Sequence, residues 1–319
     1  MTLIEQIRAL SGVELREQAP LSELGTFRLG GACTALVDCC EPGPLSQVMY
    51  LLAMHQETYV LIGGGSNLLF SDQGFEGWVV RYHSLEPLIA QDGTRLLVTG
   101  STVLDDLAAF AAEAGLEGVN GCTGIPGTVG GAIVGNAGAW GEQIGDVVES
   151  VELLDPMGDV YTAEAAELEF AYRHSKLKTC DEIVLCAQLT LREGDTVALQ
   201  AQRAAILEKR AEKHPDLAID PCIGSIFKNI EPSSAAGRRQ AAGYFLEQAG
   251  AKTFRVGGAQ VYEKHANIIV KRAECTAQDV YDLSLKMHAA VQDQLDFSLI
   301  REVRFLGPFD GADSHKGFF

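Results

Sequence analysis

The sequence has no apolar run that approaches the roughly 18 residues needed to cross a membrane. Its first residues, MTLIEQIRALSG, place Glu5 and Arg8 inside the apolar pattern. That interruption leaves no continuous hydrophobic segment for a signal peptide and instead favours a short amphipathic helix. We therefore expect a cytoplasmic protein that has no membrane partner.

Metal-binding patterns are also missing. The eight cysteines include no C-x-x-C pair, and no two histidines stand at metal-ligand spacing. In a chain of 319 residues, isolated cysteines are typical of reduced thiols packed in the interior. We expect no metal site.

Positive charge is scarce, with 25 Lys and Arg against 43 Asp and Glu and a net charge of −18. This balance argues against a nucleic-acid partner. Residues 203–273 are the exception, with 12 basic against 7 acidic side chains, a local charge of +5. Such a segment can attract a small anionic substrate. Ordinary solvated charges on helices are the alternative explanation.

The pattern of apolar residues predicts a mixed α and β chain. Strands are expected at 59–62, 78–81, 96–99, 151–154 and 184–191, and helices at 44–56, 104–114, 197–213 and 276–295. Ser101 or Thr102 is the expected N-cap of the second of these helices. The charged, Ala-rich helix near 197–213 marks a domain boundary, and the sequence shows no repeats.

Two glycine-rich loops are candidate binding sites. Gly63-Gly64-Gly65-Ser66-Asn67-Leu68-Leu69 follows a predicted strand, and consecutive glycines let the backbone approach a ligand such as a diphosphate closely. A plain hairpin turn is the alternative, although three glycines exceed what a turn needs. The second loop, Gly121–Gly141, contains eight glycines. It has neither the lysine of a P-loop nor a G-x-G-x-x-G fingerprint at a strand-to-helix turn. Interspersed apolar residues indicate a packed segment lying against something flat or phosphorylated, such as a flavin.

Seven segments together resemble the UDP-N-acetylenolpyruvoylglucosamine reductases, in order and spacing over about residues 20–307. They are TFRLGG (26–31), GGGSNLL (63–69), GIPGTVGGA (124–132), FAYRHS (170–175), GSIFKN (224–229), GGAQVYEKHANIIV (257–270) and EVRFLG (302–307). The short stretch between Tyr172 and Ile183 is similar to the subtype that has no long loop over the substrate. The chain departs from the family pattern at Ile230, where proline is usual, and at Tyr262, where a small polar residue is common.

The resemblance implies an α+β protein with an FAD-binding fold of the vanillyl-alcohol-oxidase type in two lobes, followed by an α/β substrate-binding domain. We expect the lobes at residues 1–85 and 86–199, the substrate domain at 200–300, and a C-terminal strand and tail at 301–319 that return to the active site. A monomer is expected.

The resemblance also implies non-covalent FAD, NADPH as co-substrate, and reduction of an enolpyruvyl group on a UDP-sugar in peptidoglycan synthesis. The residues that it assigns to FAD are Gly63, Gly64, Gly65, Ser66, Asn67, Leu68, Gly124, Ile125, Pro126, Thr128, Gly131, Ala132, Gly138, Ile183 and Arg304. The residues that it assigns to the substrate are Tyr172, Lys213, Lys228, Asn229, Lys252 and His265.

Three residues are the expected catalytic set. Arg173 would bind the substrate carboxylate, because a guanidinium pairs bidentately with that group. Ser225 would supply the proton, and Glu302 would position Ser225 or assist charge redistribution. Without the resemblance, each has an ordinary explanation: a surface arginine at a strand end, a helix-capping or turn serine, and a partner for Arg301 or Arg304.

Two other functions remain open from sequence. An oxidase or dehydrogenase of the wider flavin superfamily would share both glycine loops but act on another small substrate. Many such oxidases tether the flavin through His or Cys, and only Cys122 lies near a loop. A flavin-binding regulator that has lost its chemistry is disfavoured, because Arg173, Ser225 and Glu302 are all present.

Overall fold

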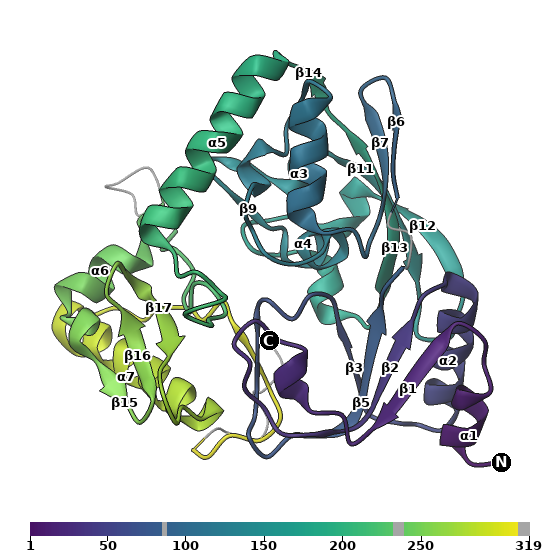
Figure 1. The fold of residues 1–319 in the computed structure, drawn as a ribbon, viewed down its shortest axis with the longest axis horizontal. Helices are drawn as coiled ribbons and strands as arrows, with labels where there is room; N and C mark the ends of the chain where they lie inside the picture. The colour runs from purple at the N-terminus through teal and green to yellow at the C-terminus, as the bar shows by residue number, and fades with distance from the viewer. Residues whose placement is uncertain (85–87, 232–238, 312–319) are drawn as a thin grey trace. The chain divides into compact units, whose positions relative to one another are not determined.

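The computed structural model describes residues 1–84, 88–231 and 239–311, and it divides into two compact units (Figure 1). The first unit contains Met1–Ala19, Cys33–Gly64 and Glu76–Arg210; the second contains Pro20–Ala32, Gly65–Phe75 and Ala211–Phe319. Two early segments, which the sequence assigned to the first FAD-binding lobe, thus belong to the second unit. The boundary lies between Arg210 and Ala211, inside helix α5 (Thr196–Lys213), within the range 197–213 in which the sequence places it and about ten residues after the expected start of the substrate domain at residue 200.

A four-stranded sheet forms one part of the first unit. Its order is β1-β2-β5-β3, from β1 (Val13–Glu17), β2 (Cys33–Cys39), β5 (Phe75–Tyr82) and β3 (Tyr59–Ile62). Helices α1 (Leu3–Arg8) and α2 (Pro42–Met54) lie together beside it (Figure 1). The buried positions of α2, at Leu45, Val48, Met49 and Leu52, recur every three or four residues, so one face of the helix enters the core.

A five-stranded antiparallel sheet forms the other part of the first unit. Its order is β12-β11-β13-β7-β6, from β12 (Val160–Glu164), β11 (Val148–Leu154), β13 (Ile183–Thr190), β7 (Arg95–Thr99) and β6 (Ile89–Asp92). Helices α3 (Leu104–Glu113) and α4 (Val129–Gly135) pack on one face. Because strand side chains alternate, Val184 points to this core while its neighbour Leu185 packs with the core of the first sheet.

Short pairings complete the first unit. A hairpin joins β9 (Gly138–Ala139) to β10 (Glu142–Gln143), and β8 (Leu116–Glu117) pairs with β14 (Arg192–Glu193).

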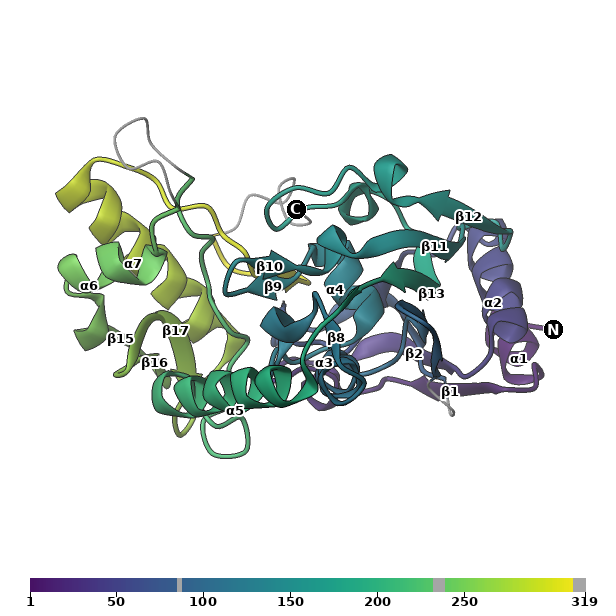
Figure 2. The ribbon, with the colours of Figure 1, turned by 90° about the horizontal axis from the view of Figure 1, so that it is seen from above.

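The second unit has a three-stranded antiparallel sheet, β15-β16-β17, made of β15 (Arg255–Val256), β16 (Ala259–Tyr262) and β17 (His265–Lys271). Helices α6 (Ala242–Gln248) and α7 (Ala277–Leu295) contact this sheet (Figure 2). Strand β4 (Leu68–Phe70), at the end of the first glycine loop, pairs in parallel with β18 (Arg304–Leu306). The chain therefore returns to the first loop near its C-terminus.

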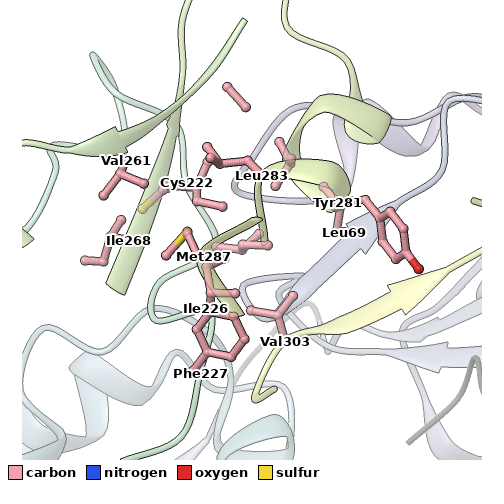
Figure 3. Packing of buried hydrophobic residues seen from close by; sticks show 14 of the residues in the cluster. Leu69, Cys222, Ile226, Phe227, Val261, Ile268, Tyr281, Leu283, Met287 and Val303 are labelled. Atoms are coloured by element: carbon pink, nitrogen blue, oxygen red, sulfur yellow. The ribbon is translucent and has the colours of Figure 1, made fainter. Parts of the chain in front are cut away.

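One continuous core holds the second unit together. Leu69 of β4 packs in the same cluster as Ile226, Ile268 of β17, Met287 of α7 and Val303, although these residues are far apart in the sequence (Figure 3). Burial of each such side chain contributes about 1.5–3 kcal/mol. This core thus fixes the backbone on which Ser225 and Glu302 stand.

Two sequence expectations about local structure are wrong. The segment Gly121–Gly141 is not a loop throughout, since it contains α4 and strand β9. Val103, not Ser101 or Thr102, is the N-cap of α3, and it makes no side-chain cap. The Thr102 hydroxyl instead pairs with that of Thr99 at 2.8 Å, so it is not available for the helix. None of the helices in the described ranges is both long and apolar enough to cross a membrane.

Candidate functional site

The two glycine loops meet in the first unit. A Cβ on Gly63 would come within 2.6 Å of Thr128 Oγ1, and one on Gly64 within 3.0 Å of the Gly127 Cα. Only glycine permits this approach of one backbone to the other. Gly64 and Gly131 are exposed, so the loops present backbone rather than side chains to the surface. A flat, phosphorylated cofactor such as FAD fits a surface of this kind.

Thr128 shapes the second loop directly. Its hydroxyl accepts the Gly131 N–H at 3.2 Å and caps α4, which therefore begins at Val129. The other FAD candidates of this unit lie in the same loop or on the adjoining strands; they are Gly124, Ile125, Pro126, Ala132, Gly138 and Ile183.

The first loop continues into the second unit at Gly65, whose φ of +62° and 2.1 Å Cβ approach to the Leu24 carbonyl exclude a side chain. Asn67 then holds the C-terminal segment. Its amide donates to the Glu302 carbonyl at 3.2 Å, and its own carbonyl accepts the Arg304 N–H at 3.1 Å. Two residues assigned to FAD, Asn67 and Arg304, thus flank the segment that carries Glu302.

Ser225 lies in an isolated β-bridge and caps no helix, which excludes the capping explanation. It pairs with Ile268 of β17, and the next residue, Ile226, accepts the Glu302 N–H at 2.8 Å. Lys228 N–H donates to the Ile300 carbonyl at 2.8 Å. The structure therefore brings the Ser225 and Glu302 segments side by side within the second unit.

Arg173 lies in the first unit, on a two-residue turn between Ala171 and His174, which exchange both backbone hydrogen bonds at 3.0 Å. Its φ is +53°, an unusual conformation for a side chain of this size. Nη1 donates to the Gly138 carbonyl at 2.9 Å, and the guanidinium carbon lies 5.4 Å from the centre of the Tyr172 ring. Arg173 is therefore a fixed, partly buried cation and not a surface arginine at a strand end.

Two substrate-binding candidates of the second unit, Lys213 and Lys252, lie near a third, His265. Burial lowers the pKa of His265, and the nearby Lys213 and Lys252 ammonium groups lower it further. The ring stacks on His214 with centroids 5.4 Å apart. Lys252 also pairs with Glu247 at 2.6 Å. Two lysines beside a neutral imidazole form a surface suited to an anion.

Asn229 and Ile230 connect this region to helix α6. Asn229 Oδ1 accepts the Ala242 N–H at 3.2 Å, at the start of the helix. Ile230 exchanges backbone hydrogen bonds with Gln240 at 2.9 and 3.0 Å. A proline at position 230 would have no N–H to donate to Gln240. Isoleucine in place of the usual proline therefore allows this hydrogen bond. Tyr262, the other departure, is 5% exposed and packs in the core.

Sequence reasoning missed an ion pair that holds the second glycine loop, formed by Asp105 and Arg203 and called the Asp105 clamp below. Asp105 of α3 accepts the Gly124 N–H at 2.6 Å and pairs bidentately with Arg203 of α5 at 2.7 and 2.8 Å. The hydrogen bonds from Arg203 are the largest cause that lowers the pKa of Asp105. Arg210 is two helical turns beyond Arg203 on the same face of α5. Its side chain lies against Gly124, and burial lowers its pKa. No local sequence pattern links Asp105 to Arg203, which is 98 positions away. The only related feature in the sequence is the excess of basic residues in 203–273, which includes both arginines.

Comparison with known proteins agrees with this geometry. One family model, the FAD binding domain, matches residues 35–164, and a second, the UDP-N-acetylenolpyruvoylglucosamine reductase C-terminal domain, matches residues 215–306. The UDP-N-acetylenolpyruvoylglucosamine reductase of a Synechococcus strain is 36% identical over 308 residues, or 95% of each chain. That of Moorella thermoacetica is 38% identical over 291 residues, covering 90% of this chain and 92% of its own.

A solved structure shows the same fold. The crystal structure of UDP-N-acetylenolpyruvylglucosamine reductase from Thermus caldophilus matches with a TM-score of 0.75 at 29% identity, over 92% of this chain and 99% of the other. The expected α+β fold with an FAD-binding domain is thereby confirmed. The protein is an FAD-dependent oxidoreductase. Within that class, the chain belongs to the UDP-N-acetylenolpyruvoylglucosamine reductase family.

Proposed function

We propose that this protein uses NADPH to reduce the enolpyruvyl group of a UDP-N-acetylglucosamine derivative to a lactyl ether, giving UDP-N-acetylmuramate for peptidoglycan. The observation that carries the proposal is the pairing of the Ser225 and Glu302 segments, tied to the first glycine loop by Asn67. Family membership over nearly the whole chain supports it.

In the first unit, FAD would be held by residues of the two glycine loops. In the second unit, the residues proposed to bind it are Gly65, Ser66, Asn67, Leu68 and Arg304. When bound, it supplies the hydride that adds to the terminal carbon of the double bond. The nearby Cys122 is 1% exposed, and burial raises the pKa of its thiol to about 12, so it remains an unreactive thiol. This supports FAD that is bound without a covalent link.

The side chains would then control charge and protonation. Arg173 binds the substrate carboxylate, and its interaction strengthens as negative charge develops on the neighbouring carbon. Ser225 Oγ donates the proton to that carbon, so hydride and proton together saturate the double bond. Glu302 assists this transfer from the adjoining segment. Tyr172, Lys213, Lys228, Asn229, Lys252 and His265 bind the rest of the nucleotide sugar.

The test uses the purified protein with FAD under anaerobic conditions. Addition of NADPH should bleach the visible absorbance of the oxidised flavin, and the enolpyruvyl nucleotide sugar should restore it without oxygen. Bleaching by NADPH without recovery would reject this substrate and favour an oxidase or another dehydrogenase. A yellow colour that stays with acid-precipitated protein would contradict non-covalent FAD.

A further inference from the structure

Two buried asparagines each hold backbone next to a proposed catalytic residue, one in each unit. Asn267 of β17 is 2% exposed, and Asn136 at the end of α4 is 0% exposed. A buried amide costs free energy unless its donor and its acceptor are both paired. In both residues the amide makes its two hydrogen bonds to the backbone of another segment.

Asn267 binds both backbone groups of a single residue. Its Oδ1 accepts the Phe227 N–H at 3.0 Å, and its Nδ2 donates to the Phe227 carbonyl at 2.8 Å. Its own backbone carbonyl accepts the Ile226 N–H at 2.9 Å. Ile226 and Phe227 also pack in the core beside Met287 and Val303 (Figure 3). Three hydrogen bonds and this packing therefore fix both the position and the rotation of the segment.

Ser225 directly precedes this fixed pair. It bridges to Ile268, the neighbour of Asn267, while Ile226 accepts the Glu302 N–H. The backbone at Ser225 is thus held from two sides, and only the direction of the hydroxyl is left to adjust. A proton donor gains from such rigidity, because a misplacement of about 1 Å costs about 100-fold in rate.

Asn136 makes the corresponding contacts in the first unit. Its Nδ2 donates to the Ala171 carbonyl at 2.8 Å, and its Oδ1 accepts the Gly145 N–H at 3.0 Å. Ala171 forms the base of the turn that carries Arg173. Asn136 has a φ of +44°, a left-handed conformation that asparagine tolerates better than most residues. The amide therefore anchors a turn in which Arg173 also has positive φ.

We propose that Asn136 and Asn267 are positioning residues, Asn136 for the carboxylate-binding Arg173 and Asn267 for the proton donor Ser225. The proposal rests on the proposed function. Each asparagine acts through a neighbouring backbone segment, so the two should fail in different ways. Loss of the Asn267 contacts should slow proton transfer, whereas loss of the Asn136 contacts should weaken substrate binding.

The isosteric variant Asn267→Asp gives the sharpest test. An ionised carboxylate accepts the Phe227 N–H but faces the Phe227 carbonyl as a second acceptor, while a protonated one can donate to it. At pH 8 we expect reoxidation of NADPH-reduced enzyme by substrate to be about 100-fold slower than in wild type. Reoxidation should recover as the pH falls toward 5, and bleaching by NADPH should be unchanged.

The pH dependence is read against the wild-type profile, because other ionisable groups lie around this segment. On β17 and the elements beside it these include Lys213, His214, Lys228, Lys252, His265, Lys271, His288, Arg301 and Glu302. They are common to both proteins, so a recovery at low pH seen only in the variant belongs to position 267. A larger solvent deuterium effect on reoxidation in the variant would show that proton transfer is the slowed step.

Asn136→Asp is the matched variant in the other unit. We expect its dissociation constant for the enolpyruvyl nucleotide sugar, measured by flavin absorbance of oxidised enzyme, to rise about 10-fold or more. Its solvent deuterium effect should stay at the wild-type value. Asn267→Asp should show the opposite pair of results. Equal behaviour of the two variants would overturn the proposal.

Three further variants complete the test. Leu52→Ala, in the core beneath helix α2 and outside the core that holds Ser225, controls for lost stability and should keep both half-reactions. Asn267→Ser removes the amide without adding charge and replaces Asn267→Asp if that variant does not fold; its slow reoxidation should not depend on pH. Normal reoxidation in Asn267→Asp with slow reoxidation in Ser225→Ala would overturn the positioning role alone. Normal reoxidation in Ser225→Ala would instead overturn the proposed proton donor.

Discussion

The two units hold their candidate residues through contacts of different sequence separation. In the first unit, the Arg173 turn is held by Asn136, 35 residues from Ala171, within one run of chain. In the second unit, Asn67 lies 235 residues from its hydrogen-bond partner Glu302. The segment of the proposed proton donor therefore depends on pairing between distant parts of the chain, whereas the turn that carries Arg173, the proposed carboxylate ligand, does not. Perturbations of the first glycine loop should consequently affect the second unit more.

The largest expected effect separates two adjacent glycines of that loop. Gly65→Ala places a Cβ at 2.1 Å from the Leu24 carbonyl with φ at +62°, so we expect a loss of about 3 kcal/mol in the free energy of unfolding. Gly64→Ala meets only Gly127, whose Cα lies at 3.0 Å, and should lose about 1 kcal/mol. Urea unfolding of both variants checks the order, and equal losses would contradict the comparison.

Core substitutions compare the units themselves. Leu283→Ala in the second core and Leu107→Ala in the first both remove fully buried side chains, and each should cost about 3 kcal/mol. Hydrogen exchange should show the loss of protection mainly in β17 for the former and in β7 and β13 for the latter. Uniform loss in both variants would show that the units unfold as one.

The Asp105 clamp should make the first unit sensitive to acid. Because its folded pKa is lowered below 3.8, Asp105 contributes stability that is present above the unfolded pKa and lost as the pH falls through the folded value. Asp105→Asn should therefore cost about 1–2 kcal/mol at pH 7, and this cost should shrink as the pH falls below 3.8 toward the folded pKa. Apo-protein unfolding across pH 3–7 checks this, and an equal loss at all pH values would contradict it.

The smallest effect distinguishes two helix caps. Thr276→Ala removes the capping box of α7 and should cost about 1 kcal/mol without changing FAD affinity. Thr128→Ala removes the cap of α4, should cost a similar amount, and should also weaken FAD binding, since Thr128 borders both glycine loops. Fluorescence titration of FAD into the apo variants separates them. Equal affinities would argue against a role of Thr128 in the cofactor site.

Local patterns predicted much of the fold. The strand at Tyr59–Ile62 and the helix Ala277–Leu295 follow the expected ranges, because periodicity and capping act over a few residues. The same patterns did not predict α4, because its sequence contains three glycines, which are more typical of a loop. Nor did they show that residues 20–32 and 65–75 join the second unit, since that depends on long-range pairing such as β4 with β18.

The sequence predicted which residues belong to the candidate site, but it predicted only some of the contacts between them. Resemblance supplied Arg173, Ser225 and Glu302, and the structure then placed the last two on neighbouring segments. The supports were not predictable, because Asn136 and Asn267 carry no charge and no motif of their own. Their partners are fixed only when the chain folds.

Rapid-mixing kinetics on Ser225→Ala test the central claim most directly. The account predicts that NADPH bleaches the flavin of this variant at the wild-type rate, while reoxidation by the enolpyruvyl nucleotide sugar is slowed by about 100-fold or more, within the range usual for general acid catalysis. Ser225→Cys, which keeps an ionisable proton, should recover part of that rate. Wild-type reoxidation in Ser225→Ala would contradict the account, because the proton would then come from elsewhere.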